Sequence, residues 1–147
     1  MDDKTTLLII EDDDVDVEAL TRGINARGIG YDIRTGHDGV EAMAILNEIT
    51  SNPMNKCLVV LDLNMPGMNG LQFLAELRKN EQTKRTLVFV FTTSDREQDK
   101  LAAYDLNVAG YFLKSNFDGM LDTLSAYTEN VRYPTKAVST AFSNTAS

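Results

Sequence analysis

The feature that most constrains the fold is an alternation between short apolar runs and longer segments of helical period. The runs at 7–10, 58–61 and 87–91 are apolar at every position, as expected for strands buried on both faces of a parallel sheet. The segment 31–35 alternates between polar and apolar residues, and the run at 110–113 is short, so both suit positions near the sheet edges. The sequence therefore predicts five strands.

A helical pattern follows each predicted strand. Its apolar residues recur at spacings of three and four, which gathers them into one stripe that can cover the sheet. The five stripes are Val17, Leu20 and Ile24; Ala42, Ile45, Leu46 and Ile49; Leu71, Leu74 and Leu77; Leu101 and Tyr104; and Phe117, Met120, Leu121, Leu124 and Val131. Five such units predict right-handed crossovers and an α/β fold with a doubly wound parallel sheet, which binds ligands at the carboxyl ends of its strands.

The length and the C-terminal composition predict one domain and a tail. A chain of 147 residues is ordinary for one compact domain with a single core. Pro134 is expected to end the last helix. Residues 133–147 are rich in Thr, Ser, Ala and Asn and carry little apolar mass, so we expect a flexible C-terminal tail there.

Charge and hydropathy exclude several classes of protein. The net charge of −8 argues against nucleic-acid binding, because phosphate backbones attract basic surfaces. No apolar stretch approaches the roughly 20 residues of a membrane span, and no basic region followed by a long apolar stretch marks a secretory signal. Cys57 is the sole cysteine, so an internal disulfide is impossible. We therefore expect a cytoplasmic protein that is not bound to membranes.

Acidic residues follow the first and third predicted strands. Glu11 and Asp12 lie directly after the first, and Asp62 lies directly after the third. The carboxyl ends of parallel strands are neighbours, so these carboxylates should converge and repel one another unless a cation binds. Oxygen ligands in small number, with no His or Cys nearby, favour Mg²⁺. An acidic run alone is more simply a solvated helix cap, but the buried strand before Asp62 argues against that explanation.

A lysine and two threonines lie at the ends of the fifth and fourth predicted strands. Lys114 should direct its ammonium toward Asp62, or toward a phosphoryl oxygen on it. Thr93 offers a hydroxyl donor at the same edge, with the adjacent Thr92 as the alternative. Together with a cation held by the acidic pair, these groups describe phosphoryl transfer onto the Asp62 carboxylate.

These residues resemble those of the response-regulator receiver domains over residues 5–132. The pattern Asp-x-x-Met-Pro-x-Met-x-Gly at 62–70 is specific when an acidic pair precedes it and a strand-end lysine follows it. The shared segments are 7–13, 61–70, 93–94 and 111–114. The resemblance implies a flavodoxin-like sheet of five parallel strands in the order 2-1-3-4-5, with five helices.

The resemblance also implies a role for each site residue. Asp62 would be the phosphorylated residue, and the implied Mg²⁺ ligands are Asp12, Asp62, Glu11 (directly or through water) and the backbone carbonyl of Asn64. Thr93 and Tyr111 would be switch residues that alter the surface of the fourth helix, fifth strand and fifth helix. Such a protein is a signalling domain and not an enzyme, with weak self-phosphorylation from small donors and weak autodephosphorylation. Asn64 and Asp95 would help to position the hydrolytic water.

Two residues depart from the family pattern. Ser115 follows Lys114 where the family usually has proline, which leaves open whether the Lys114–Ser115 peptide bond is cis or trans. Glu11 stands where aspartate is commoner and is one methylene longer, which puts its direct contact with the metal in doubt.

The Glu-Asp pair, Thr-Thr-Ser and Lys-Ser are most similar to small single-domain regulators that serve phytochrome-type histidine kinases. That resemblance implies a kinase histidine as phosphodonor, a light input and a downstream protein target. Members of that group often form dimers.

Three other functions share parts of this pattern. A haloacid-dehalogenase-type hydrolase also uses a strand-end aspartate, but it needs a second acid two residues later, where this chain has Asn64. A flavin carrier would need a phosphate-binding loop where residues 11–13 are acidic. A receiver-like scaffold that acts without phosphorylation is the strongest alternative to the signalling function.

Overall fold

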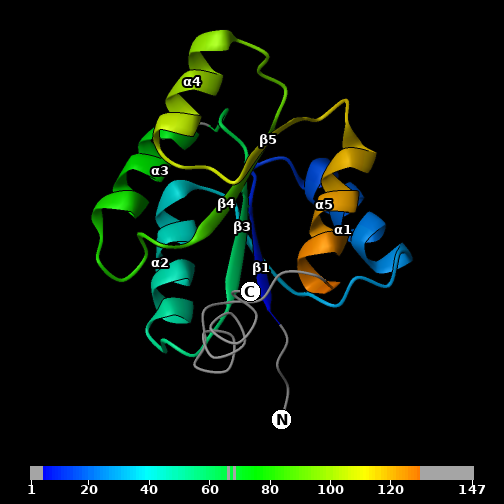
Figure 1. The fold of residues 1–147 in the computed structure, drawn as a ribbon, viewed down its shortest axis with the longest axis horizontal. Coiled ribbons are helices and arrows are strands. Elements are labelled where there is room, and N and C mark those ends of the chain that lie inside the picture. The colour runs from blue at the N-terminus through cyan, green and yellow to red at the C-terminus, as the bar shows by residue number, and fades with distance from the viewer. Residues whose placement is uncertain (1–4, 66, 68, 130–147) are drawn as a thin grey trace, which may run out of the picture.

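Five strands alternate with five helices along the chain (Figure 1). The structure, a computed structural model, describes residues 5–65, 67 and 69–129. The strands are β1 (Thr6–Ile10), β2 (Asp32–Gly36), β3 (Cys57–Leu61), β4 (Leu87–Thr92) and β5 (Gly110–Leu113). The helices are α1 (Asp14–Ala26), α2 (Gly39–Thr50), α3 (Gly70–Lys79), α4 (Glu97–Asp105) and α5 (Phe117–Glu129). Among the described helices, none is long and apolar enough to cross a membrane.

The strands form one parallel sheet in the order β2-β1-β3-β4-β5. This confirms the predicted fold, with the alternating segment and the short segment as the two edge strands. In Figure 1 the sheet separates α2, α3 and α4 on one side from α1 and α5 on the other. The register pairs the last residue of β1, Ile10, with Gly36 of β2 and Leu61 of β3. Three neighbouring strands therefore end at the same level.

Each central strand contributes side chains to two separate layers of the core. In β1, Leu8 and Ile10 belong to the layer under α2, α3 and α4. Leu7 and Ile9 belong to the layer under α1 and α5. Because successive side chains of a strand point to opposite faces, a strand between two such layers must be apolar throughout. This is the physical origin of the continuous apolar runs in the sequence.

The predicted apolar stripe of the fourth helix is wrong. Leu101 and Tyr104 are 60% and 52% exposed, and Ala103 is the buried residue of α4. Within the described residues, no side chain caps the N-terminus of this helix, whereas Asp13, Asp38 and Asn69 cap α1, α2 and α3. Fewer buried contacts and a missing cap make α4 the least firmly held helix of the fold.

The predicted strand bounds are correct to within one residue. β2 begins and ends one residue later than predicted, and β4 extends to Thr92. Three predicted features lie outside the described residues: the place of Val131 in the fifth apolar stripe, the helix end at Pro134 and the tail at 133–147.

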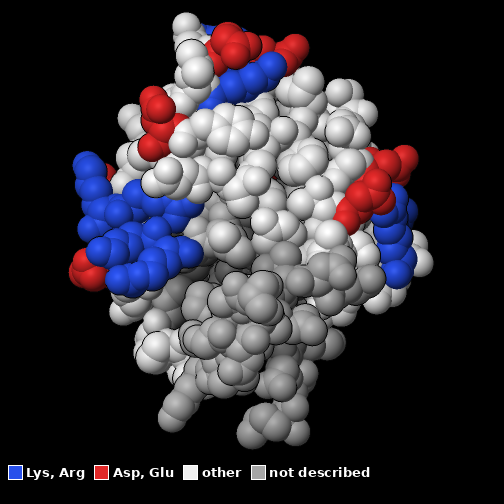
Figure 2. Space-filling model, in the orientation of Figure 1, with Lys and Arg blue, Asp and Glu red and all other residues white. Residues whose placement is uncertain are grey.

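Basic side chains gather around the end of α3, although the chain as a whole is acidic (Figure 2). Arg78, in the last turn of α3, hydrogen-bonds to backbone carbonyl groups of two loops. Its guanidinium donates to the carbonyl oxygens of Leu106 (2.7 Å), Lys84 (2.8 Å), Thr86 (2.8 Å) and Asn107 (3.0 Å). Arg78 therefore ties α3 to the loop before β4 and to the loop between α4 and β5.

Replacing Arg78 with methionine should lower the free energy of unfolding by about 2–4 kcal/mol, because four carbonyls lose their donor. Urea unfolding measures this loss. Arg22→Met is the matched control, since Arg22 forms an exposed pair with Glu18 on α1 and should cost less than about 0.5 kcal/mol. Equal stability of the two variants would contradict the structural role assigned to Arg78.

Candidate functional site

The candidate site lies at the carboxyl edge of the sheet, where three side chains follow three strands. Glu11, Asp62 and Lys114 are each the first residue after a strand. In each case the backbone N–H still bonds to the neighbouring strand, so the sheet fixes where the side chain begins. The three bonds join Glu11 N to Gly36 O (3.0 Å), Asp62 N to Ile10 O (3.0 Å) and Lys114 N to Thr92 O (2.8 Å).

A glycine allows the loop after β3 to pack closely against α3. Gly70 N donates to Leu63 O at 2.8 Å. A Cβ at position 70 would lie 2.6 Å from the carbonyl oxygen of Asp62 and 2.7 Å from Leu63 Cα, which is too close for any other residue. Gly70, the first residue of α3, thus packs directly against the backbone carbonyl of Asp62.

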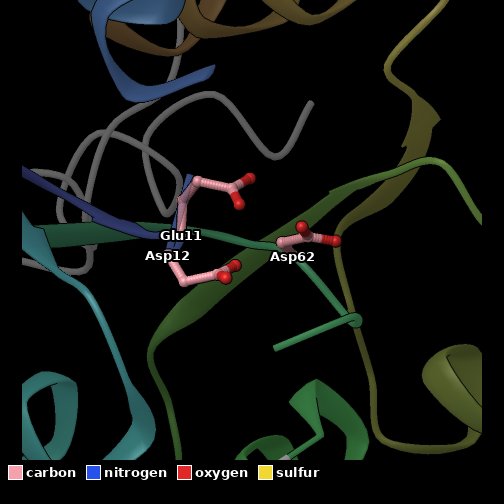
Figure 3. Close-up of side chains that lie close together, drawn as sticks. All are labelled: Glu11, Asp12 and Asp62. Carbon is pink, nitrogen blue, oxygen red and sulfur yellow. The ribbon is translucent and has the colours of Figure 1, made fainter. Parts of the chain in front are cut away.

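Three carboxylates meet at this edge, as Figure 3 shows for Glu11, Asp12 and Asp62. One oxygen from each lies within 4.8 Å of the others. Glu11 and Asp62 are each only 5% exposed, whereas Asp12 is exposed. All three ligand atoms are carboxylate oxygens, which is the donor set that a hard divalent cation prefers. The residues present therefore fit a divalent cation.

The ammonium of Lys114 connects two of these acids, Glu11 and Asp62. Its Nζ donates to Glu11 Oε1 at 2.7 Å and to Asp62 Oδ2 at 3.1 Å. A third bond runs to Asp16 Oδ2 at 2.6 Å. Asp16 was not singled out from the sequence, because acidic residues in a first helical turn are already explained by the helix dipole. Its spatial relation to Lys114, 98 positions away, leaves no signal in a local pattern.

Burial and mutual repulsion change the proton affinity of the site. Burial raises the pKa of Glu11 to about 7, aided by the charge of Asp62 and opposed by the hydrogen bond from Lys114. Burial alone would lower the pKa of Lys114, but hydrogen bonds to Asp16 and Glu11 and the charge of Asp62 raise it above its usual value. Lys114 is therefore a permanent cation, while Glu11 gains and loses a proton near neutral pH.

The two candidate threonines have different surroundings. Thr93 Oγ1 lies 3.4 Å from the side-chain amide of Asn64, and the Asn64 backbone N–H donates to Asp62 Oδ1 at 3.2 Å. Thr92 is fully buried, and its Oγ1 accepts from Ser94 N at 3.4 Å. By strand alternation Thr92 shares a face with Val90, in the core layer against which Tyr111 packs.

Tyr111 links β5 to the loop that precedes α4. Its hydroxyl donates to the carbonyl of Ser94 at 2.8 Å, and its partly buried ring packs against the core.

The structure also describes the Lys114–Ser115 peptide bond and the surroundings of Asp95. No described peptide bond is cis, so the Lys114–Ser115 bond is trans. Asp95 pairs with Lys100 at 2.6 Å, so its carboxylate already has a cationic partner.

Comparison with known proteins identifies relatives of this chain. A family model described as the response regulator receiver domain matches residues 7–125. Response regulator Rcp1 of Synechocystis sp. is 36% identical over 112 residues, which is 74% of this chain and 76% of Rcp1. Aerobic respiration control protein ArcA of Escherichia coli is 37% identical over 108 residues, 74% of this chain but only 41% of ArcA.

Solved structures of cyanobacterial regulators share the fold over most of their length. The phosphorylated cyanobacterial phytochrome response regulator RcpA superposes with a TM-score of 0.75 at 27% identity, covering 90% of this chain and 99% of RcpA. The Mn²⁺-bound form of Rcp1 superposes with a TM-score of 0.72 at 30% identity, covering 89% of this chain and 99% of Rcp1.

Divalent-cation binding should strengthen with rising pH until about pH 7 and then level off, because the raised pKa of Glu11 means that a proton must leave before the cation can bind. Calorimetric titration with Mg²⁺ across this range, in two buffers of different ionisation enthalpy, measures both the affinity and the protons released. Glu11→Gln should bind more weakly and lose the pH dependence. Wild-type affinity that does not change with pH would contradict this assignment.

Proposed function

This chain belongs to the response regulator receiver domain family, and on that premise we propose that Asp62 accepts a phosphoryl group from a sensor histidine kinase with the help of Mg²⁺. The family is a signalling module and not a class of catalytic enzyme. The observation that carries the proposal is the meeting of a buried strand-end carboxylate, Asp62, with two further acids and one lysine. Two buried carboxylates with a partly buried lysine at one edge have no simpler use in the fold.

The reaction is a transfer between two nucleophiles. An Asp62 carboxylate oxygen attacks the phosphorus of a phosphohistidine, the P–N bond breaks, and the imidazole nitrogen keeps the electron pair and takes up a proton. Glu11, Asp12, Asp62 and the Asn64 carbonyl would hold Mg²⁺, which neutralises charge on the phosphoryl oxygens when bound. Lys114 supplies a fixed positive charge for a phosphoryl oxygen.

The proposed output is a change in the surface formed by α4, β5 and α5. Two observations support it. Tyr111 bonds to the Ser94 carbonyl just before α4, and α4 itself has one buried residue and no side-chain cap among the described residues. A loosely held helix next to a loop that is held by one hydrogen bond from Tyr111 is the kind of element that a new charge can bias. A downstream protein would bind to α4 through its exposed Leu101 and Tyr104.

The pathway and the assembly of this protein are finer proposals. The relatives include regulators whose names place them with phytochromes, which supports a phytochrome-type kinase as the phosphodonor, a light input and a cytoplasmic location. A homodimer is part of the same proposal. The domain would span residues 5–132, of which the family model matches 7–125, with a C-terminal tail at 133–147.

Incubation with Mg²⁺ and acetyl phosphate should add one phosphoryl group to the wild-type protein and none to Asp62→Asn, because the amide cannot attack phosphorus. Intact mass measures the adduct, and chelation of Mg²⁺ beforehand should prevent it. Asp105→Asn is the matched control, since Asp105 is an exposed acid at the end of α4. No adduct on wild type, together with no binding of beryllofluoride, would favour a scaffold that acts without phosphorylation.

The two threonines can be separated by removing each hydroxyl while keeping the side-chain shape. Thr93 was favoured from the sequence, but the face that Thr92 shares with the layer around Tyr111 favours Thr92 as the hydroxyl that couples the site to Tyr111. Thr92→Val should weaken beryllofluoride binding by about tenfold, the effect of one hydrogen bond to a charged group, and should leave the Tyr111 NMR signals unchanged on binding. The same result for Thr93→Val instead would return both roles to Thr93.

A further inference from the structure

Lys114 has no hydrogen left for a fourth acceptor. An ammonium carries three N–H donors, and here they are directed at Asp16 (2.6 Å), Glu11 (2.7 Å) and Asp62 (3.1 Å). If Asp62 is phosphorylated, a phosphoryl oxygen can bind Lys114 only by displacing one of these three carboxylates. The resting site therefore contains a competition for a single cation.

Asp16 holds the most favourable position in that competition. The distance from Lys114 Nζ to Asp16 Oδ2 is 2.6 Å, which is 0.5 Å shorter than the 3.1 Å from Lys114 Nζ to Asp62 Oδ2. The ammonium therefore lies nearer to Asp16 and Glu11 than to the proposed phosphoacceptor Asp62. Asp16 is also the one of the three acceptors that does not belong to the group of acids able to share a cation, so metal binding would not remove it from the competition.

The carboxylate of Asp16 is not needed to form the helix that carries it. The N-terminus of α1 is capped by Asp13, whose Oδ1 accepts from the backbone of Val15 at 2.9 Å and of Asp16 at 3.4 Å. The Asp16 side chain is 37% exposed, against 6% for Glu11 and Asp62. The Asp16 carboxylate accepts from Lys114, whose side chain reaches α1 from the end of β5.

We infer that Asp16 is a positioning residue that restrains Lys114 in its resting place and so sets how readily the lysine transfers to a phosphoryl group on Asp62. The inference rests on the proposed function. With Asp16 in place, Lys114 must leave a short charge-assisted bond before it engages the phosphoryl oxygen fully. Without that carboxylate, Lys114 is free to shift toward Asp62, and the phosphorylated state gains stability relative to the resting state.

The test compares three variants for beryllofluoride binding at saturating Mg²⁺. Asp16→Asn keeps the shape and removes the charge, and should bind about five- to tenfold more tightly, the effect of one partly buried charge-assisted bond. Asp16→Glu restores the charge and should return affinity close to wild type. Asp14→Asn is the matched control, because Asp14 lies in the same helical turn but contacts His37 at 3.3 Å. It should stay within about twofold of wild type.

A second readout follows Lys114 itself, which a merely structural role of Asp16 would not move. In protein labelled with ¹³C-lysine, the ε-carbon signal of Lys114 is assigned by its loss in Lys114→Arg. In wild type, this signal should shift when beryllofluoride binds. In Asp16→Asn without beryllofluoride, it should already lie part of the way toward the bound position.

The outcomes separate this inference from the proposed function. If wild type takes up phosphoryl groups on Asp62 but Asp16→Asn matches wild type and Asp14→Asn in both readouts, the role of Asp16 is overturned and the receiver function stands. Weaker binding by Asp16→Asn would also overturn it, since Asp16 would then assist the phosphorylated state. If wild type neither binds beryllofluoride nor is phosphorylated, the proposed function fails and this inference fails with it.

Discussion

The site depends on one ammonium that holds together acids which would otherwise repel one another. Glu11 and Asp62 are almost completely buried, and two like charges without water between them are strongly unfavourable. The Lys114 ammonium donates to both carboxylates, and the backbone N–H of the same residue donates to Thr92 O of β4. Burial, with the charge of Asp62 beside it, raises the pKa of Glu11 even in the presence of Lys114, and a divalent cation would offset the negative charge that one ammonium leaves.

The sequence predicts the fold and most of the site because both follow from strand alternation. A strand between two core layers must be apolar at every position, so its end is marked by the first polar residue, and parallel strands bring those ends together. Glu11, Asp62 and Lys114 were found in this way. Asp16 and the Ser94 carbonyl were not, since one lies in an acidic run with an ordinary explanation and the other is a backbone atom that no residue type marks. The predicted apolar stripe of α4 was wrong because the small residue Ala103, and not Leu101 or Tyr104, makes the buried contact.

The helices that flank the sheet are held with different firmness. On one side, α1 and α5 approach so closely at Gly23 that a Cβ there would lie 2.8 Å from Leu121 Cδ1, and Arg27 pairs with Asp118 and Asp122 across the same contact. On the other side, α4 covers the sheet with little more than Ala103. On that side α2 and α3 are packed by larger buried residues, so the weaker packing is confined to α4.

The carbonyl contacts of Arg78 fix one end of α4. They hold Leu106 and Asn107, directly after the last residue of α4, while the opposite end of the helix has no cap among the described residues. The N-terminal turns of α4 are instead bound to the preceding loop, through Ser94 Oγ to Asp99 at 2.6 Å and Lys100 to Asp95 at 2.6 Å. The two ends of α4 are therefore coupled to different parts of the chain: the C-terminal end to α3 through Arg78, and the N-terminal end to the loop after β4 that Tyr111 also contacts.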